Sequence, residues 1–221
     1  KGKELRRAYS ISSSPEKDGI TIGIKKVDNG GFSNYANSKL QVGDTLEVME
    51  PEGRFIFKPS KEVQKIAAFV AGSGITPIMS IVKSALDSNP KNQFVLVYGN
   101  KSYEETMFYT DLVKLELEYA NRFFIYFTNS QTREDKALFG RIDTSTVNYA
   151  LKNKHKNVDF SAYYLCGPEA MINTVQDTLL DNGVDKDKIL FELFTSTEIK
   201  EELPIQAEGS TAITVVLDDE E

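Results

Sequence analysis

The chain has 221 residues, enough for one large domain or two modest ones, and its hydrophobic content of 40% is ordinary for a globular protein. A formal net charge of −7 disfavours non-specific nucleic-acid binding, which needs Lys and Arg side chains to neutralise phosphates. One Cys and one His exclude an internal disulfide, a four-thiolate iron–sulfur cluster and a two-His metal site within the chain, so an organic cofactor is expected to carry any redox chemistry.

No apolar run approaches the roughly 18 residues that a membrane-spanning helix needs. We therefore expect neither a membrane span nor a metal site, and the cytoplasm is the expected location. The first residue is Lys1, not Met, and the chain starts in what reads as a strand. We expect it to be a fragment or a processed chain.

The first informative segment is Arg7-Ala8-Tyr9-Ser10. In a strand, alternate side chains share a face, so Arg7 and Tyr9 are expected to point the same way. A guanidinium can hold a phosphate by two parallel hydrogen bonds, and a tyrosine ring beside it can lie flat on a ring system. This set suits a flavin nucleotide. The alternative is an ordinary strand with an exposed Arg and a half-buried Tyr.

Residues 1–59 are expected to form part of an antiparallel β domain. Alternating isoleucines predict a strand over 20–24, and residues 45–48 predict another. Between them, a Gly-rich turn leads into a short helix over 32–40. Backbone N–H groups of Gly31 and Phe32 and the Ser33 hydroxyl could bind a phosphate there, although a plain hairpin loop is the alternative.

From residue 60 onward, short apolar runs alternate with helical segments, which predicts a doubly wound, five-stranded parallel sheet over 60–196. The expected strands are 66–71, 94–98, 123–127, 162–166 and 189–194, and the expected helices are 77–87, 103–119, 144–154 and 168–182. Residues 197–208 are expected to form a linker, and 211–217 the first strand of a further domain.

Gly72-Ser73-Gly74-Ile75-Thr76-Pro77 follows the first of these strands. Glycines allow a ligand close to the backbone, Thr76 is a candidate N-cap, and the free N–H groups of the helix favour a pyrophosphate. Pro77 departs from the dinucleotide fingerprint, whose last position is Gly, so a plain turn is the alternative. Cys166-Gly167-Pro168 repeats the design after the fourth strand, which predicts a cleft between the two turns.

The order of the motifs resembles the ferredoxin–NADP reductase superfamily, over about residues 5–196. Besides the segments above, the resemblance rests on Tyr98-Gly99, on Gly140-Arg141-Ile142-Asp143 and on Phe191-Glu192-Leu193-Phe194. It implies a partial antiparallel β-barrel FAD domain in 1–59 and an NAD(P) domain in 60–196. Residues 197–221 resemble a linker and the opening of a 2Fe–2S ferredoxin domain. This is the domain order of reductases that serve multicomponent oxygenases, notably the phenylacetyl-CoA epoxidase reductase type.

The resemblance also implies residue roles. Near the reacting atoms it places Tyr9, Ser10, Cys166 and Glu192. For FAD it implies Arg7, Tyr9, Ser10, Ile24, Lys25, Lys26, Gly31, Phe32, Ser33 and Phe194, and for the nicotinamide nucleotide Gly74, Thr76, Pro77, Cys166, Gly167 and Pro168. The four cluster Cys are absent, so a 2Fe–2S centre is expected only in a domain outside this chain.

The choice of nucleotide is expected to depend on the segment after the third strand, where an acid would favour a free ribose hydroxyl. Here no acid occurs before Glu134, and Ser130 and Arg133 could bind a 2′-phosphate. The sequence thus favours NADPH, with NADH possible if Arg133 belongs to a solvated loop.

The expected function is the transfer of electrons from NAD(P)H through FAD to an iron–sulfur acceptor that serves an oxygenase. One alternative is a stand-alone flavin reductase or the reductase part of a flavohaemoprotein. An alternative of another class is a catalytically silent nucleotide-binding module.

Overall fold

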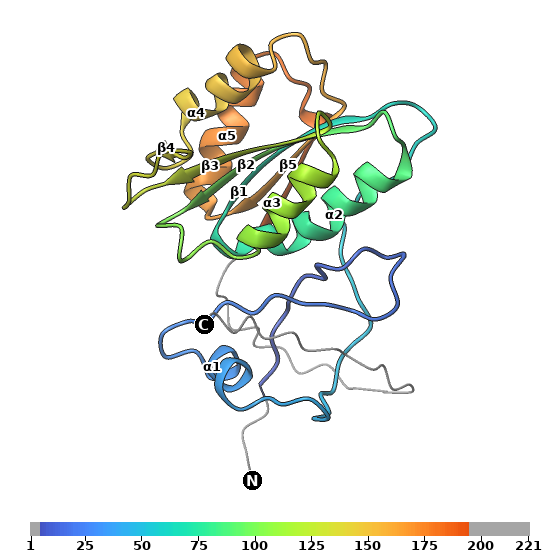
Figure 1. Ribbon diagram of the computed structural model, residues 1–221, viewed down its shortest axis with the longest axis vertical. Coiled ribbons are helices and arrows are strands. Elements are labelled where there is room, and N and C mark those ends of the chain that lie inside the picture. Colours follow the sequence, from blue (N-terminus) through green and yellow to red (C-terminus); the bar gives the residue numbers. More distant parts are fainter. Residues whose placement is uncertain (1–4, 195–221) are drawn as a thin grey trace.

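The computed structural model describes residues 5–194 (Figure 1). Its main element is a six-stranded parallel sheet in the order β4-β3-β2-β1-β5-β6. The strands are β1 Lys65–Ala71, β2 Gln93–Asn100, β3 Phe123–Asn129, β4 Leu138–Phe139, β5 Ala162–Gly167 and β6 Ile189–Leu193. All five predicted strands are confirmed. The two-residue β4 was not predicted, because a strand of that length leaves no periodic pattern.

Helices cover both faces of the sheet, as Figure 1 shows. On one face lie α2 (Ile75–Ser88) and α3 (Tyr109–Glu118), and on the other lie α4 (Thr144–Asn148), its π-helical continuation Tyr149–Lys154, and α5 (Glu169–Asp181). The central strand β1 supplies both cores, because Ala68 and Val70 pack towards α2 while Ala67 and Phe69 pack towards α5. Burial on two faces explains why β1 is apolar throughout.

The chain order creates one switch point in this sheet. From β1 the chain adds β2 and then β3 on one side, and it later returns to add β5 and β6 on the other. The turns after β1 and β5 therefore leave the same edge of the sheet in neighbouring positions. In open α/β sheets, ligands bind at this place.

The N-terminal part of the chain lies on the side of the sheet that α2 and α3 cover (Figure 1). It contains α1 (Gly31–Ser38), which confirms the predicted short helix. The predicted strands are less regular than expected. Among the described residues, 20–24 has bridge positions at Ile20 and Ile22, and Ile22 pairs antiparallel with Ile11, whereas 45–48 forms no strand. Strands need a row of backbone partners, and Val48 within 45–48 is 54% exposed.

One predicted helix starts later than expected, and another changes type along its length. Helix α3 starts at Tyr109 rather than at residue 103, and the residue before it, Phe108, has a left-handed φ of 58° that no helix continues through. The helix predicted over 144–154 is confirmed in extent, but its second half is π-helical. The predicted linker and further domain after residue 196 lie outside the described residues.

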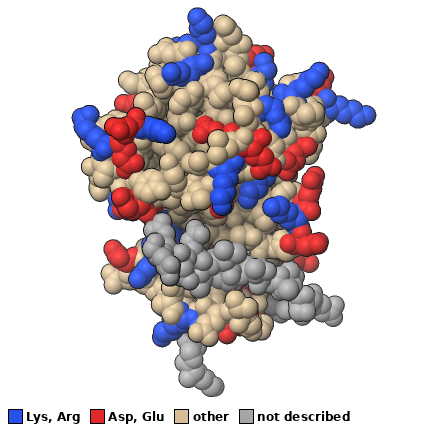
Figure 2. All heavy atoms as spheres, in the orientation of Figure 1, with Lys and Arg blue, Asp and Glu red and all other residues tan. Residues whose placement is uncertain are grey.

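Charged side chains on the face drawn in Figure 2 are mixed, with Lys and Arg lying among Asp and Glu. None of the described helices is long and apolar enough to cross a membrane. In residues 5–194, no three side chains of the metal-ligating types gather at one place.

Candidate functional site

The turns after β1 and β5 touch at the switch point. A Cβ atom added at Gly74 would overlap the carbonyl oxygen of Cys166 and lie 3.0 Å from the backbone nitrogen of Gly167. Gly167 itself has a φ of 152°, which disfavours any other residue. Glycine is therefore required on both sides of this contact. The sequence predicted a cleft between the two turns, and the structure places their backbones in direct contact.

The turn after β1 is a short 3-10 segment, Gly72–Gly74, and α2 begins at Ile75 without a side-chain cap. The prediction that Thr76 is the N-cap is wrong. Thr76 is the second helical residue, and its hydroxyl donates to the Ser73 carbonyl at 3.0 Å. Pro77 follows within the first turn, where its missing N–H is no loss. The helix thus presents a positive dipole end at the sheet edge without a side chain to neutralise it.

Cys166, at the end of β5, is fully buried. Its register partner on β6 is Glu192. Burial, and then the neighbouring Glu192 carboxylate, raise the pKa of the thiol above its ordinary value. Cys166 is therefore a neutral thiol at physiological pH, suited to packing against a ligand and unsuited to nucleophilic attack.

Glu192 connects the sheet to the N-terminal part of the chain. The hydroxyl of Ser10 donates a long hydrogen bond of 3.4 Å to Glu192 Oε2. Burial raises the pKa of Glu192, while the hydrogen bond from Ser10 opposes that shift. The structure thus brings together three of the four residues predicted to lie near the reacting atoms: Ser10, Cys166 and Glu192.

The fourth, Tyr9, belongs to an aromatic group with Phe32 and Tyr35. The Tyr9 and Phe32 ring centroids lie 5.6 Å apart at 45°, and the Phe32 and Tyr35 centroids lie 6.3 Å apart. Tyr9 is half-buried, and this burial raises the pKa of its hydroxyl against the opposing effect of Arg7. Arg7 is exposed and donates to the Arg6 carbonyl at 2.7 Å.

The predicted phosphate loop at Gly31 to Ser33 forms the N-terminus of α1. No side chain caps this end, and Ser33 is buried. A Cβ atom at Gly30 would overlap the Ser33 hydroxyl, so the backbone approaches this side chain as closely as only Gly permits. A helix N-terminus of this kind suits an anion.

Predicted flavin ligands on the segment after Gly23 have different surroundings. The Ile24 carbonyl accepts a hydrogen bond from Asn37, and Lys26 is exposed. Lys25 instead reaches the α/β domain, where its Nζ lies 3.4 Å from Glu105 Oε2. The structure gives Lys25 a protein partner that the sequence did not predict. Phe194 is 40% exposed at the end of the described residues.

A hollow, which we call the aromatic hollow, lies beyond the carboxyl ends of β2 and β3. Its lining residues are Tyr103, Thr106, Tyr109, Phe127, Asn129, Glu134, Lys136 and Ala137. The two residues predicted to choose the nucleotide, Ser130 and Arg133, are not in this lining. The Arg133 guanidinium lies over the Phe139 ring at 4.1 Å, and the Ser130 N–H donates to the Asn100 carbonyl.

Sequence reasoning missed several residues at this edge. The hydroxyl of buried Tyr98 donates to the Gly72 carbonyl at 3.0 Å. The neighbouring Asn100 is 9% exposed, and neither polar atom of its amide has a hydrogen-bond partner among the described residues. A polar residue at the end of an otherwise apolar strand was the available signal. Buried polar atoms left unpaired in this way are uncommon and suit a bound polar ligand.

Comparisons with known proteins agree on both parts of the chain. Residues 1–57 match the family model of the oxidoreductase FAD-binding domain, and residues 69–177 match that of the oxidoreductase NAD-binding domain. One of the subunits of 1,2-phenylacetyl-CoA epoxidase from Escherichia coli K12 is 34% identical over 220 residues, covering 94% of this chain and 60% of the relative. The ferredoxin reductase component of 3-ketosteroid-9-alpha-monooxygenase from Rhodococcus rhodochrous is 29% identical, covering 87% and 51%.

The chain therefore spans about half to three fifths of the length of these relatives. Among solved structures, the cytochrome b5 reductase domain of Ulva prolifera nitrate reductase is 26% identical with a TM-score of 0.72, covering 87% of this chain and 81% of that one. A ferredoxin NADP+ reductase from Neisseria gonorrhoeae, with bound FAD and NADP, has a TM-score of 0.70 at 20% identity, covering 85% and 79%. The second likeness shows the fold alone.

Proposed function

The chain belongs to the oxidoreductases in which an FAD-binding domain precedes an NAD-binding domain, and from this premise we propose that it passes electrons from NAD(P)H through FAD to an iron–sulfur acceptor of an oxygenase system. The observation that carries the proposal is the junction of Ser10, Cys166 and Glu192. It joins the two domains at the edge of the sheet where a nicotinamide nucleotide is expected.

The nucleotide fits the observed edge. The direct contact of the Gly74 and Gly167 backbones brings the two turns to one place, so a single nucleotide bound at this edge can contact both. The uncapped start of α2 suits the pyrophosphate. The unpaired amide of Asn100 and the aromatic hollow around Tyr103 and Tyr109 supply a hydrogen-bonding group and ring faces for the other end of the nucleotide.

FAD fits the N-terminal domain by the same kind of observation. The uncapped N-terminus of α1, with its close Gly30–Ser33 approach, suits the flavin pyrophosphate. Arg7 offers an exposed guanidinium for a phosphate. The half-buried ring of Tyr9 offers a face for the isoalloxazine. Ile24, Lys26 and Phe194 remain proposed flavin neighbours, and Lys25 is assigned another role below.

When bound, NAD(P)H supplies a hydride and FAD accepts it and releases electrons one at a time. The residues of the chain position the two rings and exclude water. Buried Cys166 closes one side of the nicotinamide pocket as a neutral thiol. Ser10 offers a hydroxyl to the flavin ring, and Glu192 orients that hydroxyl through its hydrogen bond. No general acid or base is required for hydride transfer itself.

The nucleotide is proposed to be NADPH, with a modest preference over NADH. Lys136 lines the aromatic hollow. Arg133 lies outside that lining, over the Phe139 ring, but it is close in sequence to Lys136 and adds a second cation to this segment, which favours a 2′-phosphate. Glu134 lines the aromatic hollow, where a carboxylate favours a free ribose hydroxyl over a 2′-phosphate. The Glu134 carboxylate also accepts a hydrogen bond from Thr132. The opposing charges limit the selectivity.

The acceptor is proposed to be a 2Fe–2S ferredoxin domain or an iron–sulfur oxygenase protein. This is supported by the relatives, which are named as part of an epoxidase and as the ferredoxin reductase component of a monooxygenase. The cytoplasm is proposed as the location, in keeping with the single Cys held as a free thiol.

Anaerobic titration of the full-length protein tests the proposal. After reconstitution with FAD, the absorbance bands of oxidised flavin should appear and then bleach on addition of NADPH, and less efficiently with NADH. Reoxidation by an added ferredoxin would support the acceptor assignment, whereas reoxidation only by free flavin would support a stand-alone flavin reductase. A protein that binds nucleotide but takes up no flavin would be a catalytically silent module and would contradict the proposal.

A further inference from the structure

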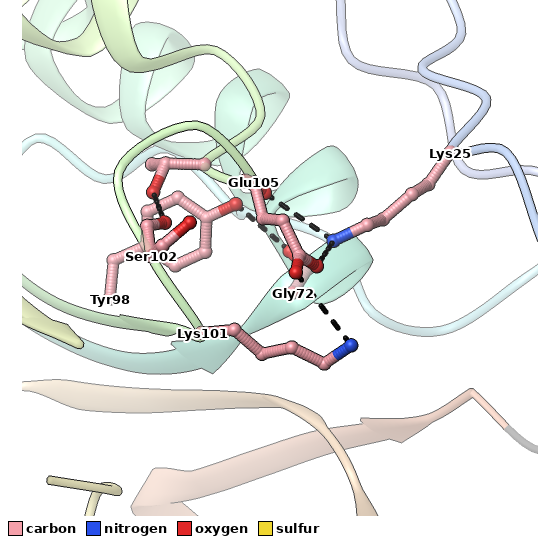
Figure 3. A network of polar contacts seen from close by, with 7 residues as sticks. Lys25, Gly72, Tyr98, Lys101, Ser102 and Glu105 are labelled. Carbon is pink, nitrogen blue, oxygen red and sulfur yellow. Dashed lines mark hydrogen bonds and ion pairs between the residues drawn. The ribbon is translucent and has the colours of Figure 1, made fainter. Parts of the chain in front are cut away.

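Residues 101–108, between β2 and α3, form what we call the connecting loop. Figure 3 shows the loop with Glu105 pointing towards Lys25 of the N-terminal domain and Tyr98 lying behind it. The loop holds its own turn through the Thr106 hydroxyl, which donates to the Ser102 carbonyl at 2.9 Å. It contacts three parts of the molecule that the proposed reaction has to bring together.

The first contact is with the FAD domain. Lys25 Nζ lies 3.4 Å from Glu105 Oε2 and donates to the Glu105 carbonyl at 3.3 Å (Figure 3). Lys101 Nζ lies 3.7 Å from the other carboxylate oxygen of Glu105. The Lys25 and Glu105 side chains are 34% and 39% exposed, so water screens the pair only in part.

The same contact has an apolar half. A Cβ atom at Gly23 would lie 2.9 Å from Phe108 Cζ and 2.9 Å from Thr76 Cγ2. Gly23 therefore allows the FAD domain to pack directly on the last residue of the loop and on the first turn of α2. Phe108 holds a left-handed φ of 58°, an unfavourable conformation for a bulky residue that surrounding packing has to maintain.

The second contact is with the aromatic hollow, because Tyr103 and Thr106 of the loop contribute to its lining. The third is with the turn after β1. The Tyr98 hydroxyl donates to the Gly72 carbonyl at 3.0 Å. Burial raises the pKa of this hydroxyl, and the backbone of Met107 in the loop, which lies near it, has a smaller effect that lowers it. Tyr98 thus links the connecting loop to the start of the glycine turn that is proposed to hold the pyrophosphate.

We propose that the connecting loop couples nucleotide binding to the position of the FAD domain, with Glu105 and Lys25 as the positioning residues of that coupling. This inference rests on the proposed function. Tyr103 and Glu105 are two residues apart, so a nucleotide that fixes the tyrosine in the hollow also fixes the carboxylate that holds Lys25. The coupling is reciprocal, as any linkage between two binding events must be.

The proposal changes the role of Lys25. As a flavin ligand, Lys25 would be needed for FAD retention, and its replacement would not be repaired by changing Glu105. As a positioning residue, Lys25 would be dispensable for FAD binding, and the charge-exchanged pair would recover part of the rate lost in each single variant. The recovery would be incomplete because Lys101 repels the cation introduced by Glu105→Lys. The two roles therefore predict opposite results in one set of variants.

Four variants of the full-length protein separate the roles: Glu105→Lys, Lys25→Glu, the double exchange, and Glu104→Lys as the matched control. Glu104 neighbours Glu105 in sequence and is exposed, so its variant makes the same charge change outside the contact. Rapid mixing with saturating NADPH or NADH measures flavin reduction. We expect each single variant at the contact to slow this rate by about two- to fivefold, the range for losing one partly exposed ion pair. FAD content should be unchanged, and the double exchange should recover the rate above that of either single variant, short of the wild type because of Lys101.

Hydrogen–deuterium exchange supplies a readout that does not depend on turnover. Addition of NADP+ or NAD+ should slow amide exchange in segment 20–25 of the wild type and of Glu104→Lys. It should leave that segment unchanged in Glu105→Lys and slow it again in the double exchange. A merely structural contact would alter exchange with and without nucleotide equally.

The outcomes are distinguishable. If Glu105→Lys and Glu104→Lys show the same rate of flavin reduction and the same amide exchange in segment 20–25, the coupling is overturned. The proposed function is not affected by that result. If Lys25→Glu loses FAD and the double exchange does not restore FAD binding, the coupling is overturned and Lys25 is a flavin ligand. A wild type whose flavin neither nucleotide reduces would overturn the proposed function and this inference with it.

Discussion

Ser10 and Glu192 are 182 positions apart in the sequence, and the hydroxyl of one donates to the carboxylate of the other at 3.4 Å. One residue belongs to the FAD domain and the other to the last strand of the NAD domain. Because Glu192 is also the register partner of Cys166, this bond sets the place where the two cofactors are expected to meet.

Ser10→Ala should slow flavin reduction at saturating NADPH by about three- to tenfold, the effect of one hydrogen bond on a barrier. The affinity for NADPH should change little, because Ser10 lies on the flavin side of the junction. Rapid mixing under anaerobic conditions measures both quantities. Ser84→Ala is the control, since that hydroxyl bonds the Ser80 carbonyl within α2. Equal rates in the two variants would show that Ser10 has no part in the reaction.

Glu192→Gln should make the protein more stable at neutral pH. Burial raises the pKa of Glu192 above its ordinary value of 4.5, so the folded protein holds this proton more tightly than the unfolded chain does. Stability is then lost as pH rises through the window between the two values, because ionising the carboxyl becomes costly only in the folded state. Thermal unfolding at several pH values should show a gain above this window that disappears below pH 4.5. A gain independent of pH would contradict the assigned cause.

Gly74→Ala should destabilise the protein by about 1–3 kcal/mol, the usual effect of overpacking, because its Cβ atom would overlap the backbone of Cys166. Gly99→Ala is the matched control. Its Cβ atom would meet Ile142 side-chain atoms at 3.3 Å, which can shift. Urea unfolding compares the two variants. A Gly74 variant as stable as the Gly99 variant would show that the two turns are not held in contact.

The nucleotide preference should respond in opposite directions to two neighbouring substitutions. Arg133→Ala should lower kcat/KM for NADPH relative to NADH, and Glu134→Gln should raise it, each by about two- to tenfold as for one charge near a phosphate. Steady-state kinetics with both nucleotides measures the ratio. If both variants shift the ratio in the same direction, the choice of nucleotide is made elsewhere.

Much of the α/β domain was predictable because buried parallel strands appear in a sequence as continuous apolar runs. The predicted strand over 66–71 and the observed Lys65–Ala71 differ by one residue. The start of α3 was not predictable in the same way. The sequence of residues 103–108 is compatible with a helix. In the structure, Phe108 packs against Gly23 of the other domain and has a left-handed φ, so the helix cannot begin before Tyr109.

The site was predictable only where a motif is local. The glycines after β1 and β5 indicated turns that a ligand can approach, and the direct contact between the two turns was not predicted. The Lys25–Glu105 pair joins positions 80 apart, and no local pattern reports such a contact. Ser10 was indicated by its place beside Tyr9, where a hydroxyl can contact a flavin ring, whereas Glu192 came only from the family resemblance. The prediction of a strand over 45–48 was wrong. A strand-like pattern forms a strand only where a partner strand can pair with it.

We propose that a hydride passes from NAD(P)H to FAD at the junction of Ser10, Cys166 and Glu192. Anaerobic rapid mixing of the FAD-loaded, full-length protein with NADPH, unlabelled or deuterated at the transferred C4 hydrogen, tests it most directly. We expect rapid bleaching of the flavin absorbance that deuterium slows, with the overall rate lower again in Ser10→Ala. Flavin absorbance that neither NADPH nor NADH changes would contradict the claim.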